Sequence, residues 1–281
     1  MSSHTIYNPE TVADACAVLA RTPGARVLAG GTDLLVRLKD QTTWPPLVDI
    51  NGIETLQGVT YDAGMLRIGA LTTWAVLTDH PLIAEHAQVL VQATEPVGTL
   101  EVRHRGTLGG NLASASPAGD AIPPLMALDA QIEIARGART HRVAIAEFFL
   151  GPGRTVLTAD EIIVAVWLPA GPLRRGAFAR LNRDTTGGIS KVTLALTLRC
   201  EEGILRDVRI ALGAIAPTVI RARAAEDILC GQQPTETVVE DAGAAAARAA
   251  KPISDVHANF ELRRDICAEL LRTALQKALS D

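Results

Sequence analysis

The chain has 281 residues, with 27 basic and 31 acidic side chains and a formal net charge of −4. Because 48% of the residues are hydrophobic and only 21% are charged, the composition excludes a disordered chain and predicts a packed core. The charge balance and the 3% aromatic content exclude a basic nucleic-acid surface and an aromatic platform for single strands.

The four cysteines, at positions 16, 200, 230 and 267, are too dispersed for a local zinc or iron–sulfur motif. This spacing is typical of separate thiols in a reducing compartment. The chain opens without a basic stretch followed by an apolar run, and no segment offers about 18 uninterrupted apolar residues. We therefore expect a soluble, cytoplasmic protein with no integral membrane segment and no nucleic-acid partner.

Short helical and strand patterns alternate through the first 170 residues. Asn8 and Pro9 predict the start of a first helix, as cap and first-turn residue, and Gly24 marks its end. The region from 98 to 119 carries glycines and little apolar periodicity, so we expect a long loop there. The other predicted elements are strands at 26–29, 47–50, 66–69, 131–135 and 161–168, and helical segments at 34–39, 72–77, 81–93 and 123–130.

Residues 170–176 read as a linker, after which the pattern changes. Three consecutive strands are predicted at 178–181, 191–200 and 205–215, followed by helices at 221–229, 236–250 and 261–279. The whole chain therefore predicts an α+β fold.

The first glycine pair lies between a predicted strand and a helical turn, in the sequence Leu28-Ala-Gly-Gly-Thr-Asp-Leu-Leu35. Glycine lets the backbone take positive φ, and successive N–H groups in such a turn form a concave anion site. Thr32 adds a hydroxyl donor, and Asp33 is expected to cap the turn that follows. A Gly-Gly turn by itself is more often structural, and this one matches neither the dinucleotide fingerprint nor the P-loop pattern.

The second glycine pair lies in residues 105–120, a polar stretch that ends at Asp120. Asp120 has two readings: a cap for the helix that follows, or a carboxylate that accepts hydrogen bonds from sugar-like hydroxyls. Two separate anion-friendly loops suit a ligand with a pyrophosphate and a polyol chain.

Other polar side chains carry weaker signals. The carboxylates of Asp49, Glu95, Glu101 and Asp129 have no visible partner and read as caps or solvated groups. Lys191 opens a predicted strand, where a lysine is normally solvated. The six histidines show no metal-ligand spacing, and no serine stands in a hydrolase elbow. The residues therefore predict no catalytic dyad and no metal site.

Taken together, several fragments in this order resemble the FAD-binding medium subunit of the molybdenum hydroxylases, the group that includes carbon monoxide dehydrogenase, xanthine dehydrogenase and aldehyde oxidoreductase. The resemblance covers nearly the whole chain. Its fragments include Ala29-Gly-Gly-Thr-Asp-Leu34, Val102-Arg-His-Arg-Gly-Thr107, Thr107-Leu-Gly-Gly-Asn111, Ser116-Pro-Ala-Gly-Asp120 and Arg180-Leu-Asn-Arg183.

The resemblance implies an FAD-binding domain of two α+β subdomains over residues 1–172. A smaller domain would follow over 173–281, with a short three-stranded antiparallel sheet and a helical bundle. It also implies that two segments wrap the FAD pyrophosphate, that Asp120 meets the hydroxyl-bearing chain, and that three further residues lie near the flavin. The implied FAD-binding residues are Val27, Leu28, Ala29, Gly30, Gly31, Thr32, Asp33, Leu34, Val97, Thr107, Leu108, Gly109, Gly110, Asn111, Asp120, Ile163 and Lys191.

The function implied by the resemblance is electron transfer. Substrate would be oxidised at molybdenum on a large partner subunit, and electrons would cross iron–sulfur clusters on a small partner to FAD on this chain. The implied assembly is a dimer of heterotrimers. Two alternatives stay open. One is a self-sufficient FAD-dependent oxidoreductase acting directly on a small molecule, and the other is a nucleotide-binding or assembly module without redox function.

Overall fold

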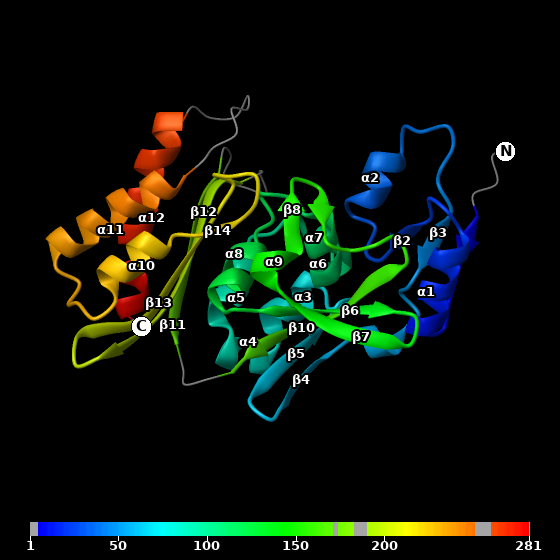
Figure 1. Ribbon diagram of the computed structural model, residues 1–281, viewed down its shortest axis with the longest axis horizontal. Coiled ribbons are helices and arrows are strands. Elements are labelled where there is room, and N and C mark those ends of the chain that lie inside the picture. Colours follow the sequence, from blue (N-terminus) through cyan, green and yellow to red (C-terminus); the bar gives the residue numbers. More distant parts are fainter. Residues whose placement is uncertain (1–4, 171–173, 183–189, 251–259, 281) are drawn as a thin grey trace.

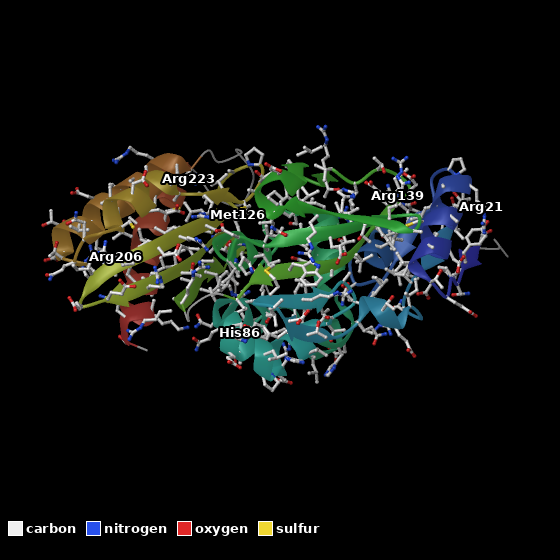
Figure 2. All side chains as sticks on the ribbon, turned by 60° about the horizontal axis from the view of Figure 1, so that its bottom comes forward. Arg21, His86, Met126, Arg139, Arg206 and Arg223 are labelled. Atoms are coloured by element: carbon white, nitrogen blue, oxygen red, sulfur yellow. The ribbon has the colours of Figure 1, made fainter. Side chains whose placement is uncertain are left out.

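The computed structural model of the chain describes residues 5–170, 174–182, 190–250 and 260–280. The molecule is elongated, with the amino-terminal elements at one end and the carboxyl-terminal sheet and helices at the other (Figure 1). Figure 2 shows the same order from another side, with Arg21 and Arg139 toward one end and Arg206 and Arg223 toward the other. Residues 171–173 of the predicted linker lie outside the described residues, as does Arg183.

The amino-terminal end is a small parallel sheet covered by one helix. Its strands β1 (Ile6–Tyr7), β3 (Leu47–Asp49) and β2 (Arg26–Leu28) lie in the order β1-β3-β2. Helix α1 (Val12–Arg21) buries one apolar face in a core that includes Val48 of this sheet and Ala135, Ile162 and Val164 of the central part. The predicted cap at Asn8 is wrong: the Thr11 hydroxyl accepts the N–H of Asp14 at 3.1 Å, so the helix begins after Thr11.

The central part is built on a five-stranded antiparallel sheet in the order β4-β5-β10-β6-β7. The sequence predicted its three inner strands, β5 (Met65–Gly69), β10 (Glu161–Pro169) and β6 (Gln131–Arg136). It missed the edge strands β4 (Val59–Asp62) and β7 (Arg139–Ala144), because most of their side chains are exposed and lack apolar alternation. A short pair, β8 (Phe149–Gly151) and β9 (Arg154–Thr155), follows helix α9 (Ile145–Phe148).

Helices gather beside this sheet. They are α3 (Trp74–Asp79), α4 (Pro81–His86), α5 (Gln88–Thr94), α6 (Leu100–Arg105), α7 (Leu108–Ser114) and α8 (Ile122–Ala127), with α2 (Leu34–Leu38) and the 3₁₀ turn η1 (Glu54–Leu56) earlier in the chain. Except for α6, which has no buried residue, these elements contribute to the buried cores. The helix predicted at 81–93 is two helices, because the backbone at Ala87 leaves the helical region.

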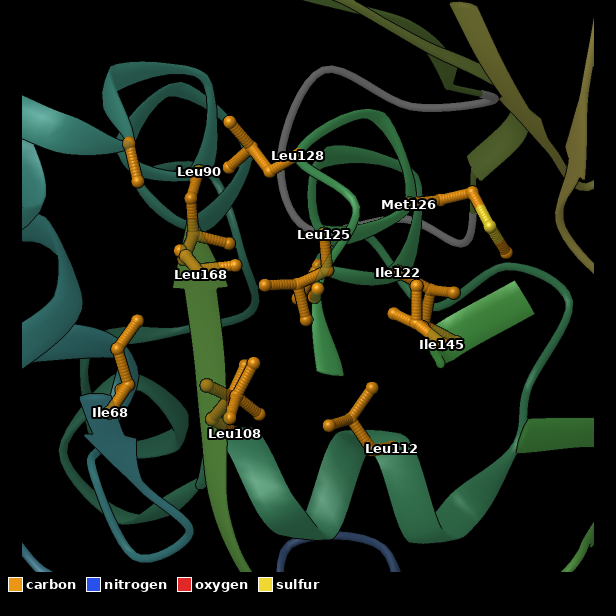
Figure 3. Packing of buried hydrophobic residues seen from close by; sticks show 14 of the residues in the cluster. Ile68, Leu90, Leu108, Leu112, Ile122, Leu125, Met126, Leu128, Ile145 and Leu168 are labelled. Carbon is orange, nitrogen blue, oxygen red and sulfur yellow. The ribbon is translucent and has the colours of Figure 1, made fainter. Parts of the chain in front are cut away.

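The prediction of a long loop at 98–119 is wrong, because this region holds all of α6 and all of α7. Helix α7 has only two large apolar residues, Leu108 and Leu112, and two glycines, so its periodicity is weak. Both leucines are fully buried and point into a core shared with Ile122, Leu125 and Ile145 (Figure 3). Tertiary packing, rather than helix propensity, therefore makes this segment helical.

The carboxyl-terminal part is an antiparallel sheet in the order β11-β12-β13-β14, covered on one face by three helices. The strands are β11 (Arg175–Asn182), β12 (Ser190–Glu201), β13 (Ile204–Gly213) and β14 (Ile220–Arg221), and the helices are α10 (Arg223–Leu229), α11 (Glu236–Ala249) and α12 (Phe260–Ser280). The three predicted strands are present, but β14 adds a fourth and β12 reaches 12 residues, so the sheet is longer and wider than expected.

Strand β12 is buried on both faces. Leu194, Leu196 and Leu198 belong to the core under the helices, whereas Ala195 belongs to the central core, where α5 and α8 contact the sheet. This alternation joins the carboxyl-terminal sheet directly to the central part of the molecule.

Candidate functional site

The first glycine segment runs from β2 to α2 and lies against the end of α6. A Cβ atom on Gly30 would lie only 1.8 Å from the carbonyl oxygen of Arg105, so only glycine permits this contact between the two segments. Gly31 has φ +75°, a conformation that other residues adopt at a cost. The two glycines therefore place the first segment beside the second.

A row of backbone N–H groups is the main feature of this segment. Among the described residues, none accepts a hydrogen bond from the N–H groups of residues 30–34. The row is partly exposed at the start of α2. Consecutive donors without protein acceptors form a site that suits a diphosphate.

Asp33 stands in this row, where its carboxylate would repel an anion. Its charge is offset by Arg37, whose guanidinium lies 3.0 Å from the carboxylate. The hydroxyl of Ser114, in the last turn of α7, also donates to Asp33 at 2.9 Å. The predicted cap is wrong, because the Asp33 side chain makes no capping bond to α2. Asp33 instead ties the first segment to α7.

The second glycine segment is the first turn of α7, and its N–H groups are already bonded. Leu108 donates to the Thr72 carbonyl at 3.0 Å, and Gly109 donates to the Ala70 carbonyl at 2.8 Å. Gly110 donates to the hydroxyl of its own cap, Thr107, at 3.1 Å. This helix end therefore offers a ligand a close approach and side-chain groups rather than a row of donors.

Gly109 and Gly110 serve different purposes. A Cβ atom on Gly109 would lie 2.8 Å from the Ala70 side chain, so this glycine is required by packing. A Cβ atom on Gly110 would meet only the Thr107 hydroxyl, at 2.9 Å, and otherwise open space. The open face of α7 is therefore at Gly110, next to the Thr107 hydroxyl.

Asn111 carries a polar atom that lacks a partner. Its Oδ1 is buried and makes no hydrogen bond within the described part of the chain. A Cβ atom on Gly119 would lie 3.2 Å from this oxygen, so the end of the polar stretch folds back over the start of α7. A buried acceptor without a donor is rare and fits a site whose donor comes from a bound ligand, such as a ribose or ribityl hydroxyl.

Asp120 lies where the central and carboxyl-terminal parts meet. The Ser190 hydroxyl donates to its Oδ1 at 2.9 Å, and Arg180 donates to its Oδ2 at 3.3 Å. Burial raises the pKa of the Asp120 carboxyl, against the lowering effects of Ser190 and Arg180. The capping alternative is wrong, because Ala121 is the N-cap residue of α8 and no side chain caps that helix. A carboxylate accepts about four hydrogen bonds, so capacity for a ligand hydroxyl remains.

The three residues expected near the flavin occupy different elements. Val97 is half-buried after α5, Ile163 is buried at a bulge in β10, and Lys191 is half-buried near the start of β12. Arg180 connects the segment that holds Val97 with Asp120, because it donates to the Pro96 carbonyl at 3.1 Å as well as to the Asp120 carboxylate. Val27 and Leu28 lie in β2, and the carbonyl of Ala29 accepts from Asn51 at 3.0 Å.

Sequence reasoning missed four residues that organise the site, namely Arg37, Asn51, Ser114 and Arg180. Ser114 lies in the polar stretch 105–120 and Arg180 in a fragment of the resemblance, but neither was assigned a role in the site. Among the described residues, no group of three or more His, Cys, Asp or Glu side chains is arranged to hold a metal ion. Within the same residues, no helix has the length and apolar character needed to cross a membrane.

Two protein families match the chain. The family described as "FAD binding domain in molybdopterin dehydrogenase" matches residues 2–171, and "CO dehydrogenase flavoprotein C-terminal domain" matches residues 176–278.

Relatives match along almost their full length. The nicotine 6-hydroxylase medium subunit of Paenarthrobacter nicotinovorans is 33% identical, covering 96% of this chain and 95% of the relative. The carbon monoxide dehydrogenase medium chain of Hydrogenophaga pseudoflava is 30% identical, covering 97% and 96%.

Solved structures agree. A structure of carbon monoxide dehydrogenase from Hydrogenophaga pseudoflava superposes with a TM-score of 0.94 at 30% identity, covering 100% of this chain and 99% of that chain. Quinoline 2-oxidoreductase from Pseudomonas putida 86 gives 0.93 at 30% identity, covering 99% and 98%.

Proposed function

Because this chain belongs to the family of FAD-binding medium subunits of molybdenum hydroxylases, we propose that the N–H row of residues 30–34 holds the diphosphate of its FAD. The observation that carries this proposal is that no residue in the described part of the chain accepts a hydrogen bond from these five donors. The neutralisation of Asp33 by Arg37 supports it, since an uncompensated carboxylate there would oppose an anion.

The chain is the FAD-binding electron-transfer subunit of a molybdenum hydroxylase complex. Its partners are a large subunit with the molybdenum cofactor, where substrate is oxidised, and a small iron–sulfur subunit that passes the electrons on. FAD supplies a group that accepts electrons singly and releases them in pairs to an external acceptor. We further propose that the complex is a dimer of heterotrimers and that it works in the cytoplasm.

The other site residues have proposed roles that follow from their surroundings. The Thr107 hydroxyl and the open face at Gly110 lie against the cofactor, and Asn111 and Asp120 accept hydrogen bonds from its hydroxyls. Val97 and Ile163 contribute apolar contacts near the ring. Lys191 contributes a positive charge that favours the negative reduced flavin.

The remaining residues of the predicted set support the backbone. Val27, Leu28 and Ala29 lead into the N–H row, and Leu34 begins α2 directly after it. Leu108 and Gly109 are buried and fix the position of α7. We propose a division into an FAD-binding domain over 1–172, with two subdomains, and a carboxyl-terminal domain over 173–281.

Amide hydrogen exchange of the apo-protein and the FAD-loaded protein tests the diphosphate assignment. We expect FAD to slow exchange of the N–H groups of residues 30–34, because they gain acceptors. The turn at Gly24, which lies before β2 and outside the site, serves as the internal control and keeps its exchange rate. Unchanged exchange at residues 30–34 in a protein that retains FAD would contradict the assignment.

A further inference from the structure

We infer that Arg180 is a positioning residue through which the carboxyl-terminal domain fixes the flavin end of the FAD site. The inference rests on the proposed function, because it concerns the same cofactor. It assigns a role to a residue that holds two other segments of the site.

The geometry of Arg180 is that of a fork between two segments. Its side chain, on strand β11, is only 15% exposed. One terminal nitrogen donates to Oδ2 of Asp120 at 3.3 Å, and the other donates to the carbonyl oxygen of Pro96 at 3.1 Å. A guanidinium holds such donors in a fixed plane, so it sets the distance between its two acceptors.

Both acceptors belong to segments of the proposed site. Pro96 directly precedes Val97, a proposed neighbour of the flavin, and Asp120 is the proposed acceptor for cofactor hydroxyls. Neither segment lies within a helix or strand, so neither is fixed by backbone ladder bonds. The Arg180 side chain therefore provides a restraint that regular secondary structure does not supply.

A second strand of the same sheet completes the restraint. Ser190 pairs with Asn182 at the end of the β11–β12 ladder, and its hydroxyl donates to Oδ1 of Asp120 at 2.9 Å. The two oxygens of Asp120 are thus held by adjacent strands, and Lys191 follows Ser190 directly. Removing Arg180 leaves Asp120 with one of these two holders and removes the donor to the Pro96 carbonyl.

Gln92 provides a matched control, because it fastens the same strand without touching the site. This residue of α5 accepts the Phe178 N–H at 2.9 Å and donates to the Gly176 carbonyl at 3.4 Å. Gln92→Met weakens the attachment of β11 to the central part but leaves the Asp120 and Pro96 contacts in place. This variant therefore distinguishes a weaker attachment of β11 to the central part from a displacement of Asp120 and Pro96.

The test measures three properties of Arg180→Met, Arg180→Lys and Gln92→Met: unfolding of the apo-protein in urea, the Kd for FAD, and the visible circular dichroism of bound FAD. For Arg180→Met we expect an FAD Kd raised by about tenfold or more, because a displaced Asp120 loses its charge-assisted hydrogen bond to a cofactor hydroxyl. We also expect an altered flavin dichroism. Arg180→Lys keeps the positive charge but not the planar fork, so it should restore part of the affinity and leave the dichroism altered.

Gln92→Met should lose stability while its Kd and dichroism stay at the wild-type values. The inference is overturned if Arg180→Met keeps both wild-type values, or if Gln92→Met changes them as much as Arg180→Met does. Should Arg180→Met fail to fold, Arg180→Lys decides alone, and wild-type dichroism in that variant overturns the inference.

Gly31→Ala in the same titration separates the role of Arg180 from the proposed diphosphate site. If it leaves the Kd unchanged, the proposed diphosphate site is wrong, whereas a raised Kd there with an unaffected Arg180→Met refutes only the role of Arg180.

Discussion

Gly31→Ala tests the N–H row without removing any of its donors. Gly31 has φ +75°, and a Cβ atom there would lie 2.8 Å from Cδ1 of Leu35, a side-chain methyl that can shift. Alanine in this left-handed conformation costs about 1–2 kcal/mol. Without FAD, the segment of residues 30–34 relaxes and avoids this strain. FAD binding requires the positive φ at residue 31 again, so the strain then lowers the affinity. We therefore expect the Kd for FAD to rise by about 5- to 30-fold.

Gly24→Ala is the matched control, because Gly24 has φ +78° and its Cβ would meet nothing within 4 Å. Its backbone strain is the same, but it lies outside the site, so it should lower the unfolding free energy by about 1–2 kcal/mol without changing the Kd. The assay is fluorescence titration of apo-protein with FAD, accompanied by urea unfolding. Equal Kd values for the two variants would refute the reasoning.

Three further predictions concern the surroundings of the row. Gly30→Ala places Cβ 1.8 Å from the carbonyl oxygen of Arg105, so the backbone must move. Urea unfolding should show that the unfolding free energy falls by about 1–3 kcal/mol, and an unchanged value would contradict the contact. Thr107→Val and Thr235→Val each remove a helix cap worth about 1 kcal/mol of stability. Only Thr107→Val should raise the Kd in a titration with FAD, and equal Kd values for the two variants would argue against a role for the Thr107 hydroxyl. Because the pKa of Asp120 is raised above its ordinary 3.8, its contribution to stability is complete below that pH and is lost as the pH rises through the folded-state pKa. The unfolding free energy of the wild type minus that of Asp120→Asn should therefore fall with rising pH, and a flat difference would contradict the shift.

The sequence predicts most of the elements with strong periodicity, such as β10 and the three carboxyl-terminal helices. It fails where burial comes from distant partners. Helix α7 was expected to be loop because its two leucines are too few to show a period, and their core is supplied by Ile122, Leu125 and Ile145. Strand β7 was missed for the opposite reason, since an exposed edge strand needs no apolar alternation.

The candidate site also has parts that the sequence predicts and parts that only the fold shows. The glycine pairs mark both segments in the sequence, but only the fold distinguishes them. The N–H groups of Leu108 and Gly109 donate to the carbonyls of Thr72 and Ala70, which lie 36 and 39 residues earlier in the chain. Those of residues 30–34 find no such acceptor among the residues that the structure describes. Long-range partners of this kind leave no local pattern, and the same holds for the Arg180 contacts to Pro96 and Asp120.

The measurement that tests the central claim most directly is anaerobic stopped-flow reduction of the bound flavin, with and without the two partner subunits. The chain alone, loaded with FAD, should bleach with dithionite but not with aldehydes, purines, aromatic heterocycles or carbon monoxide. Adding both partners should make the flavin bleach with the substrate of the complex. Rapid bleaching of the isolated, metal-free chain by any of these substrates would contradict electron relay and identify a self-sufficient oxidoreductase.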